Sequence, residues 1–480
     1  MRYEPVIGLE VHAQIHTASK MFCGCPVMED TGDLEPNTYV CPVCTAMPGV
    51  LPVVNERAIE IAVQTGLALH CDIPPLNRFA RKSYFYPDLP KGYQISQYAL
   101  PIAVDGHLTF EVNEVERKVG IRRAHLEEDA GKLYHQDGVS KVDLNRAGVP
   151  LLEIVSEPDM RSAEQARAYG EALRDILVYL GVNSGNMERG VMRFEANVSV
   201  RPAGSEEMGA RHEVKNLNSF RALYDSIRYE IEHQISVLES GGQIEQQTMG
   251  WNEVDGVTVP QRGKEFAHDY RYFPEPDIPP LEISHEEVAA LRSELPELPR
   301  AKKTRLIADY GLSVYDAELL VSDRDIAEYF ERVVEAGAAP KEAANWITGE
   351  LFRLMKEFNR PIDSIKTSPK ALAALIALVE QDTVNKSTAK DVLQEMVVSG
   401  RDPDAIVAEQ GLAQISDAGQ LQDVIARVLD QHPEQVEEYL SGKEQVVGWF
   451  IGRVMRATRG KANPQLAREL LRNQLEARRG

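Results

Sequence analysis

The sequence predicts an α+β protein, with strands and helices mixed in the N-terminal part and helices alone in the C-terminal part. Up to about residue 280, several stretches alternate apolar and polar residues with a period of two, as half-buried strands do. Beyond about residue 293, apolar residues recur at helical spacing, as in LQDVIARVL. The 480 residues also exceed what one core usually organises, since single cores stop growing at about 250–300 residues. More than one domain is therefore expected.

Two strands and one helix are the clearest elements of the N-terminal part. In VIGLEVHAQI, apolar residues alternate with Glu10, His12 and Gln14, and VMRFEANVSVRP shows the same alternation. The polar residues of each strand therefore share one face. Between these strands, the stretch from Ser162 to Val182 has the apolar spacing of a helix and ends at a glycine.

Helix start and stop signals divide the rest of the chain. Ser284 and Glu287 form a capping-box pattern, and further on Gly400 can end one helix and Pro403 can open the next. We predict a mixed α/β domain over 1–292, a helical domain over 293–404 and a small helical tail over 405–480.

Composition and charge limit the function classes. The net charge of −21 argues against indiscriminate nucleic-acid binding, because phosphate neutralisation supplies most of that affinity. The last 28 residues differ, with seven Arg and one Lys against two Glu, so a polyanion would be held only there. The first residues lack the pattern of a secretory signal, and no window approaches 18 uninterrupted apolar residues. We expect a cytoplasmic protein without a membrane span.

Four of the five cysteines are close in sequence, in FCGCP and YVCPVC: Cys23, Cys25, Cys41 and Cys44. Two close pairs of thiolates suit a closed tetrahedral zinc site that ties two loops together, with free thiols or a redox pair as the alternative. Four cysteines leave no open coordination position, so the zinc ion is expected to stabilise the fold without taking part in catalysis. A zinc deaminase is rejected, because its cysteine pair follows the His-x-Glu motif, whereas CPVC precedes HLE here.

The sequence contains neither standard glycine-rich phosphate loop, so any use of ATP needs another arrangement. The remaining route is a divalent cation held by carboxylates at strand edges, with basic side chains near the phosphates. Glu10 and His12 share one face of a strand and can converge on one ion. Glu153 is a lone carboxylate in the apolar run VPLLEIV, where a cation or an arginine could be its partner.

The stretch HLEEDAGK supplies the third carboxylate of this route. Strand alternation places Glu127 on the same face as His125, with Asp129 as a candidate helper outside the ligand shell, and turns Glu128 away toward solvent. A wholly solvated charged turn is the alternative. Basic and aromatic loops that resemble the lining of nucleotide pockets, or that are simply surface loops, contain Lys82, Tyr84, Asn145, Arg146 and Lys215.

The basic tail has an apolar stripe from Val447 to Val454. Arginines also recur there at steps of three: Arg453, Arg456 and Arg459. A helical face of arginines suits phosphate contacts. A solvated basic face is the alternative.

The chain resembles the B subunit of the bacterial aspartyl/glutamyl-tRNA(Asn/Gln) amidotransferases (the GatB family) in long motifs that span nearly its whole length. These are IGLEVHAQI, YFYPDLPKGYQISQ, HLEEDAGK, DLNRAGVPLLEIVSEPD, VKNLNSF, DYRYFPEPDIPP and GKANPQ. The resemblance implies a "cradle" domain with a kinase site, then a helical domain, then a YqeY-like tail that contacts tRNA.

The resemblance also implies an ATP-dependent carbon–nitrogen ligase with glutamine as the amide donor. The side-chain carboxylate of misacylated Glu-tRNA(Gln) or Asp-tRNA(Asn) would be phosphorylated by ATP, and ammonia would then displace phosphate. The amidotransferase A subunit would supply the ammonia and the small C subunit would brace the complex, with the matching aminoacyl-tRNA synthetase as a further candidate partner. The absence of a glutaminase nucleophile arrangement in this sequence agrees with an ammonia donor elsewhere.

Carried over by motif, the family's Mg²⁺ site falls on the four residues that the strand faces had singled out: Glu10, His12, Glu127 and Glu153. Candidate contacts to ATP or the aminoacyl group are Lys82, Tyr84, Asn145, Arg146 and Lys215. Candidate tRNA contacts are Arg453, Arg456, Arg459 and Lys461. The four cysteines are not universal in the family. The alternative function is a non-catalytic, zinc-containing scaffold that binds tRNA; a zinc hydrolase is disfavoured by the saturated cysteine set.

Overall fold

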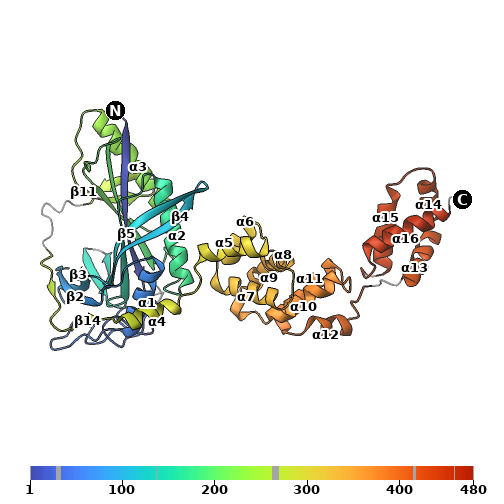
Figure 1. Ribbon diagram of the computed structural model, residues 1–480, viewed down its shortest axis with the longest axis horizontal. Coiled ribbons are helices and arrows are strands. Elements are labelled where there is room, and N and C mark those ends of the chain that lie inside the picture. The colour runs from blue at the N-terminus through green and yellow to red at the C-terminus, as the bar shows by residue number, and fades with distance from the viewer. Residues whose placement is uncertain are drawn as a thin grey trace. The chain divides into compact units, whose positions relative to one another are not determined.

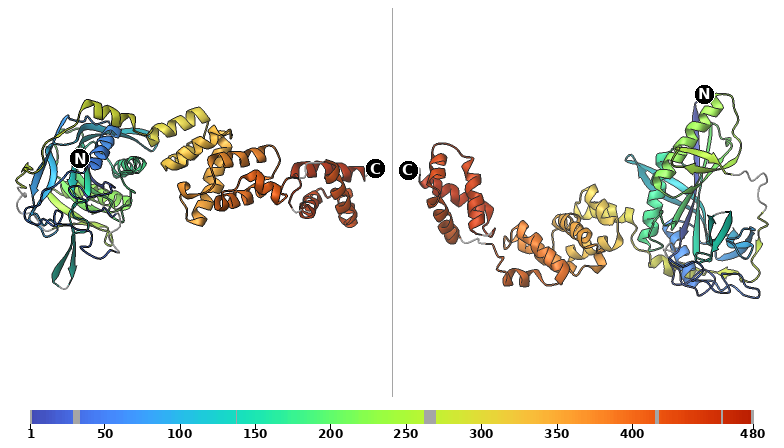
Figure 2. Two further views of the ribbon diagram at one scale, coloured as in Figure 1. Left: turned by 90° about the horizontal axis from the view of Figure 1, so that it is seen from below. Right: turned by 180° about the vertical axis from the view of Figure 1, so that it is seen from behind.

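The computed structural model describes residues 2–28, 34–136, 138–261, 270–414, 418–458 and 460–478. The chain divides into two compact units, Met1–Leu298 and Pro299–Gly480. Within the described residues, strands occur only in the first unit and the second is helical (Figures 1 and 2). The predicted α+β class is confirmed. In the same part of the chain, no helix has both the length and the apolar character needed to cross a membrane.

Twelve strands of the described residues form one sheet, in the order β12-β11-β10-β9-β1-β8-β5-β3-β2-β13, with β4 paired to β5 and β14 to β2. All of these pairs are antiparallel except β10 with β11. The strands are β1 (Tyr3–Gln14), β2 (Leu76–Ser83), β3 (Tyr93–Leu100), β4 (Ala103–Val112), β5 (Val115–Glu128), β8 (Pro150–Ser156), β9 (Met192–Pro202), β10 (His212–Leu217), β11 (Gln247–Asn252), β12 (Val257–Pro260), β13 (Phe273–Pro274) and β14 (Leu281–Glu282). A separate hairpin joins β6 (Lys132–Gln136) to β7 (Val139–Asp143).

The two faces of the central strands differ in chemistry. One face carries apolar residues such as Leu9, Leu126 and Leu152, which are buried in a single core. The helices that pack on this face are α1 (Glu56–Ala68), α2 (Ala163–Tyr179) and α3 (Phe220–Glu239). Because neighbouring side chains alternate along a strand, the polar residues of the same strands gather on the opposite face. This polar face contains the candidate site.

The second unit has two hydrophobic cores. The first, between Leu306 and Val407, is built from α5 (Pro299–Tyr310), α6 (Val314–Val321), α7 (Arg324–Glu335), α8 (Pro340–Asn345), η1 (Trp346–Leu351), α9 (Phe352–Phe358), η2 (Ile362–Ser364), α10 (Pro369–Glu380), α11 (Lys386–Ser399) and α12 (Pro403–Glu409). The other, between Leu421 and Leu475, is built from α13 (Ala418–Asp430), α14 (Pro433–Leu440), α15 (Val446–Ala457) and α16 (Pro464–Ala477).

The local signals read from the sequence correspond to observed helix ends. Ser284 and Glu287 form a capping box at the start of α4 (His285–Ser293), and Gly400 ends α11 with a positive φ of 76°. The partly buried Val288 and Leu291 of α4 pack on the first core, so the first unit continues to Leu298. The division into domains at 292 and 404 stays a prediction.

Candidate active site

Three side chains that the sequence had singled out converge on the polar face of the sheet. Nε2 of His12 lies 3.2 Å from Oε2 of Glu153 and 3.7 Å from Oε1 of Glu127. One ligand atom from each of the three lies within 4.8 Å of those of the other two, which is close enough to hold one metal ion. They come from adjacent strands β1, β8 and β5, and His12 is directly opposite Glu153 in the register. Strand alternation, read from the sequence, gives the shared face, and the strand pairing brings the three residues together.

The charges in this cluster shift one another's protonation. Burial raises the pKa of Glu127 to about 7, and the neighbouring Glu153 adds to the effect. Burial would raise the pKa of Glu153 as well, but His125 and His12 hold it below its usual range. Burial would lower the pKa of His12, but its hydrogen bond to Glu153 and the nearby carboxylates raise it to about 9. Two carboxylates this close disfavour each other's charged form, and the nearby His12 and Lys82 counter this effect on both.

Oxygen donors from two glutamates fit a hard divalent cation such as Mg²⁺, and a histidine nitrogen is compatible with a transition metal as well. The residues present therefore fit the predicted cation. Ser96 on β3 donates from Oγ to Oε2 of Glu127 at 3.5 Å, which leaves Oε1 facing His12.

Glu10, the fourth predicted ligand, lies on the same face but has a different neighbour. Its Oε1 accepts a hydrogen bond from Nδ2 of Asn197 at 3.0 Å, and it is opposite Val155, two residues along the strand from the His12 and Glu153 pair. Burial and the nearby carboxylates raise the pKa of Glu10. Glu10 is not part of the three-residue metal group found among the described residues; its role as a ligand stays a prediction.

The predicted basic contacts divide into two kinds. Lys82 on β2 lies on the polar face, with Nζ 5.0 Å from the ring centre of Tyr270. Burial would lower the pKa of Lys82, but Glu127, Tyr272 and Glu153 hold it above its usual value. Lys215 lies further along the face, between Glu195 at 2.6 Å and Glu213 at 3.0 Å.

The other predicted contacts have partners inside the chain. Tyr84 is half-buried and packs beside Tyr86. Asn145 is buried, and its side chain bonds the backbone of residues 35 and 39. Arg146 donates to the carbonyls of Ala130 and Gly131, each at 2.9 Å. Their proposed contacts with ATP or the aminoacyl group stay predictions, and the contacts observed hold loops in place.

The prediction that Glu128 is solvated was wrong. Its side chain is 5% exposed and receives Nζ of Lys91 at 2.5 Å and the backbone N–H of Ile95 at 2.9 Å. Alternation turns it to the other face as expected, but there Lys91 and the backbone N–H of Ile95 take the place of solvent. Asp129 is also buried, accepts bonds from Gln14 and from Arg193, and has its pKa lowered to about 2, since the nearby arginines outweigh burial.

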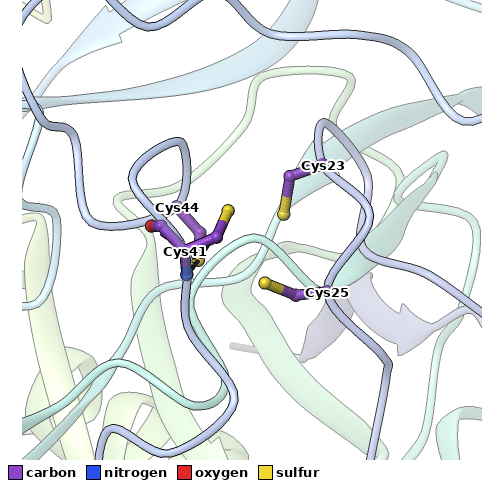
Figure 3. A group of neighbouring side chains, drawn as sticks. All are labelled: Cys23, Cys25, Cys41 and Cys44. Atoms are coloured by element: carbon purple, nitrogen blue, oxygen red, sulfur yellow. Dashed lines mark hydrogen bonds between the residues drawn. The ribbon is translucent and has the colours of Figure 1, made fainter.

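The four clustered cysteines form a second candidate metal centre. Their sulfur atoms lie within 4.8 Å of one another and point toward a common centre from two loops (Figure 3). Sγ of Cys41 and Sγ of Cys44 are 3.9 Å apart, close to the roughly 3.8 Å that tetrahedral Zn–S bonds of 2.3 Å require. The sulfur donors and their spacing fit zinc.

The environment of this centre favours the thiolate form of Cys44, whereas burial and neighbouring thiols raise the pKa values of Cys23 and Cys25. Lys20 is fully buried, and its Nζ lies 3.7 Å from Sγ of Cys44. A hydrogen bond from Cys23 lowers the pKa of Cys44 to about 4, with Lys20 contributing. The thiolate is the form that binds metal. Cys71 is buried and lies outside the group, as its sequence position suggested.

The basic tail residues lie on α15 and just after it. Arg456 is exposed, while Arg453 is half-buried with its guanidinium carbon 4.7 Å from the ring centre of Trp449. Lys461 is half-buried. Arg459 lies outside the described residues. Whether these residues bind tRNA stays a prediction.

Sequence reasoning missed two side chains beside the acidic cluster. His125 was placed on the face of Glu127 but not in the site, although its Nε2 lies 3.6 Å from Oε2 of Glu153. Arg123, two residues earlier on β5, has a buried Nε without a hydrogen-bond partner in the described residues. Both residues lie at even spacing from Glu127 in the sequence, so strand alternation could have placed them on the face of the site.

Comparison with known proteins identifies the class to which this fold and site belong. The family model described as the GatB/GatE catalytic domain matches residues 5–289, which include the acidic cluster and the four cysteines. A second model, described as the GatB domain, matches residues 328–475. The chain is therefore of the GatB/GatE class.

Full-length relatives narrow the family further. The chain is 52% identical to the B subunit of the aspartyl/glutamyl-tRNA(Asn/Gln) amidotransferase of Thermodesulfovibrio yellowstonii, over 98% of this chain and 99% of the relative. It is 52% identical to that of Myxococcus xanthus, over 98% of each chain, and 53% identical to that of Geotalea uraniireducens, over 99% of this chain and 100% of the relative. The chain belongs to the family of aspartyl/glutamyl-tRNA(Asn/Gln) amidotransferase B subunits.

Proposed function

We propose that this chain is the component of a glutamine-dependent tRNA amidotransferase that activates the side chain of a misacylated tRNA. The reaction is the ATP-dependent phosphorylation of the carboxylate of Glu-tRNA(Gln) or Asp-tRNA(Asn), followed by displacement of phosphate by ammonia to give the amide. The observation that carries the proposal is the convergence of His12, Glu127 and Glu153 on the polar sheet face, with Lys82 nearby. The family names agree with it.

The charges of the reactants explain why such a cluster suits the reaction. The attacking carboxylate and the ATP phosphates are all negative, so attack needs positive charge between them and in-line positioning. A bound Mg²⁺ ion supplies that charge when it is held by His12, Glu127 and Glu153. Lys82 adds a positive side chain next to the carboxylates. Arg123, on the same face of β5, adds a second positive side chain that acts on the cluster through His125.

The partners follow from the same proposal. The A subunit supplies ammonia, and the C subunit completes a heterotrimer. The basic tail holds part of the misacylated tRNA. The complex works in the cytoplasm. The zinc ion at the four cysteines holds two loops of the first unit and does not touch the reactants. Supporting observations are the sulfur geometry and the exposed arginine on α15.

The test replaces the carboxylates in the reconstituted complex. Glu127→Gln and Glu153→Gln are assayed for amide formation on Glu-tRNA(Gln) and Asp-tRNA(Asn) separately, with ATP and with added ammonium so that glutamine hydrolysis is bypassed. Each variant is expected to lose at least about 100-fold in rate, the usual cost of one charge-stabilising group. Glu157→Gln, at an exposed ion pair with Arg122, is the matched control. Amidation that survives both changes would refute the kinase assignment and favour the scaffold alternative.

A further inference from the structure

A row of tyrosine side chains lies beside the acidic cluster. The centres of neighbouring rings along this row are 4.2, 6.2, 6.3 and 5.8 Å apart. Aromatic rings whose centres are within about 7 Å of each other interact, so the row is continuous. Its members, in order, are Tyr98, Tyr272, Tyr270, Tyr84 and Tyr86.

The middle of the tyrosine row reaches the candidate site. Nζ of Lys82 lies 5.0 Å from the ring centre of Tyr270. Burial raises the pKa of the Tyr272 hydroxyl, and Glu153 and Glu127 add to this effect, whereas Lys82 opposes it. The charges of the cluster therefore act on Tyr272, and the row borders the place where the reactants of the proposed function would meet.

Tyr98 follows Ser96 by two residues on β3. Ser96 is paired with Glu127 in the register of β3 and β5, and its Oγ donates to Oε2 of Glu127 at 3.5 Å. Because alternate residues of a strand lie on the same face, the side chain of Tyr98 is on the face of the cluster, and its Cα is about 7 Å from that of Ser96.

The ring of Tyr98 is held by a partner and is still accessible. The planes of the Tyr98 and Tyr272 rings are 11° apart, so the two rings are stacked face to face. Tyr98 is nevertheless 50% exposed. A ring that is already ordered can stack a further planar group with little additional loss of side-chain freedom.

The reactants of the proposed function offer a nucleobase as that planar group, either from ATP or from the single-stranded 3′ end of tRNA. A pocket for a small nucleotide would enclose it, since such sites bury roughly 70–90% of a ligand. Half-exposed rings such as those of Tyr98 and Tyr86 suit a single strand instead, whose successive bases stack on aromatic side chains. The aminoacyl group at that end has to bring its carboxylate to the cluster, so the terminal base must lie near the tyrosine row.

We propose that the ring of Tyr98 stacks on the base of the 3′-terminal adenosine of the misacylated tRNA. The stacked pair of Tyr98 and Tyr272 would hold the terminal ribose, and with it the amino acid to be activated, beside Glu127 and Glu153. The inference deepens the proposed function and rests on it, because it concerns the binding of that substrate. A partner protein covering the same rings would keep the RNA end away from the cluster.

The first test needs no substitution in the protein. Fluorescence anisotropy measures binding of the full-length chain to uncharged tRNA(Gln), labelled at its 5′ end, and to the same tRNA whose 3′-terminal nucleotide lacks its base. The tRNA without the base should bind at least about fivefold more weakly, because one base stacked on an aromatic ring contributes about 5- to 150-fold in affinity. Equal binding of the two RNAs would overturn the proposal.

The second test assigns the contact to Tyr98. Tyr98→Leu should weaken binding of the complete tRNA by about the same factor and leave binding of the tRNA without the base unchanged, whereas Tyr98→Phe keeps the ring and should bind both RNAs as wild type does. Tyr315→Leu is the control, because Tyr315 is 69% exposed on α6 of the second unit; it should have no effect. If Tyr98→Leu weakens binding of both RNAs equally, the ring does not contact the terminal base.

The third test separates the two sources of an adenine base. In the reconstituted complex supplied with ammonium, Tyr98→Leu should raise the KM for Glu-tRNA(Gln) and leave the KM for ATP unchanged; the reverse would assign the ring to ATP and overturn the proposal. The binding tests involve neither ATP nor phosphorylation, so they can succeed even if the proposed function fails. Conversely, loss of amidation in Glu127→Gln and Glu153→Gln together with equal binding of the two RNAs would support the proposed function and remove this inference.

Discussion

At the scale of single residues, Glu127 and Glu128 show how strand neighbours acquire opposite roles. Glu127 faces His12 across the polar side of the sheet, whereas Glu128 is buried on the other side against Lys91. Both carboxylates are out of solvent, and each needs a cation. Glu128 has Lys91 as its partner, and Glu127 and Glu153 form with His12 a group that could hold a metal ion.

The Glu128 and Lys91 pair predicts a stability effect that is separate from catalysis. Glu128→Gln keeps the side-chain size but leaves the Lys91 charge, whose side chain is 16% exposed, without its partner. We expect a loss of about 2 kcal/mol or more in the free energy of unfolding, because breaking a largely buried pair leaves an uncompensated charge. Denaturant unfolding of the full chain measures it. Glu157→Gln breaks an exposed pair and should cost less than about 1 kcal/mol; equal effects would contradict the prediction.

A second buried carboxylate, Glu230 on α3, predicts a pH dependence. Burial alone would raise the pKa of Glu230, but hydrogen bonds from His212, Thr258 and Gln234 hold it below the usual value. The folded state therefore favours the charged form. Its stabilisation is complete above the ordinary carboxyl pKa of about 4.3 and is lost as the pH falls through the lower folded pKa.

Glu230→Gln should accordingly be less stable than wild type at pH 7, by about 1–3 kcal/mol, and the difference should narrow below about pH 4. Urea unfolding at pH 7, 5 and 3.5 gives the comparison. Glu239→Gln, at an exposed position of the same helix, should differ little from wild type at every pH. A gap between Glu230→Gln and wild type that does not change with pH would refute the role assigned to the charge.

The period of two along a strand was the only sequence signal for the roles of single residues in the site. A period of two gives the face on which a side chain lies, which was enough for His12, Glu127 and Glu153. It does not give the contacts on the other face, so the burial of Glu128, whose partner Lys91 is 37 residues away, could not be predicted. Nor does it give the register between distant strands, which places both His12 and His125 directly opposite Glu153.

At the scale of elements, caps and breaks were accessible because they depend on neighbours in sequence. Ser284 caps α4 through a side chain that accepts a backbone N–H of the first turn, and Gly400 ends α11. The strand order of the sheet depends on pairings across more than 100 residues, such as β1 with β8 and β9. Alternation within one strand contains no information about these pairings.

The cysteine loops are the element whose stability should depend most on a metal. They are joined to the rest of the unit by bonds from Asn145 and by Lys20, but few large apolar side chains of residues 23–53 are buried. Cys25→Ser should release zinc and lower the melting temperature by about 5–10 °C if the site contributes about 3 kcal/mol. Zinc content and calorimetry of the full chain test this. Cys71→Ala, outside the cluster, should keep its zinc. If the Cys25→Ser protein lacks zinc but has the same melting temperature as wild type, the zinc ion has no structural role.

At the scale of the whole molecule, charge is distributed unevenly along the chain. The net charge is −21, yet the last 28 residues contain eight basic and two acidic side chains. An acidic body repels nucleic acid in general, and a basic end attracts it locally. This distribution predicts tRNA binding that depends strongly on salt and is weakened most by changes in the tail.

Arg456 provides the sharpest test of this distribution, because it is exposed on α15 and, within the described residues, no ion pair includes it. Arg456→Ala should weaken binding of unmodified tRNA by the full chain and reduce the slope of log K against log salt by about 0.7–0.9, the value of one lost phosphate contact. Binding is measured by fluorescence anisotropy at several salt concentrations. Arg332 is exposed on α7, a helix that belongs to the other helical core. Arg332→Ala is the matched control and should leave the slope unchanged. If both variants bind tRNA as wild type does, the tail is a solvated basic face and the tRNA is held elsewhere.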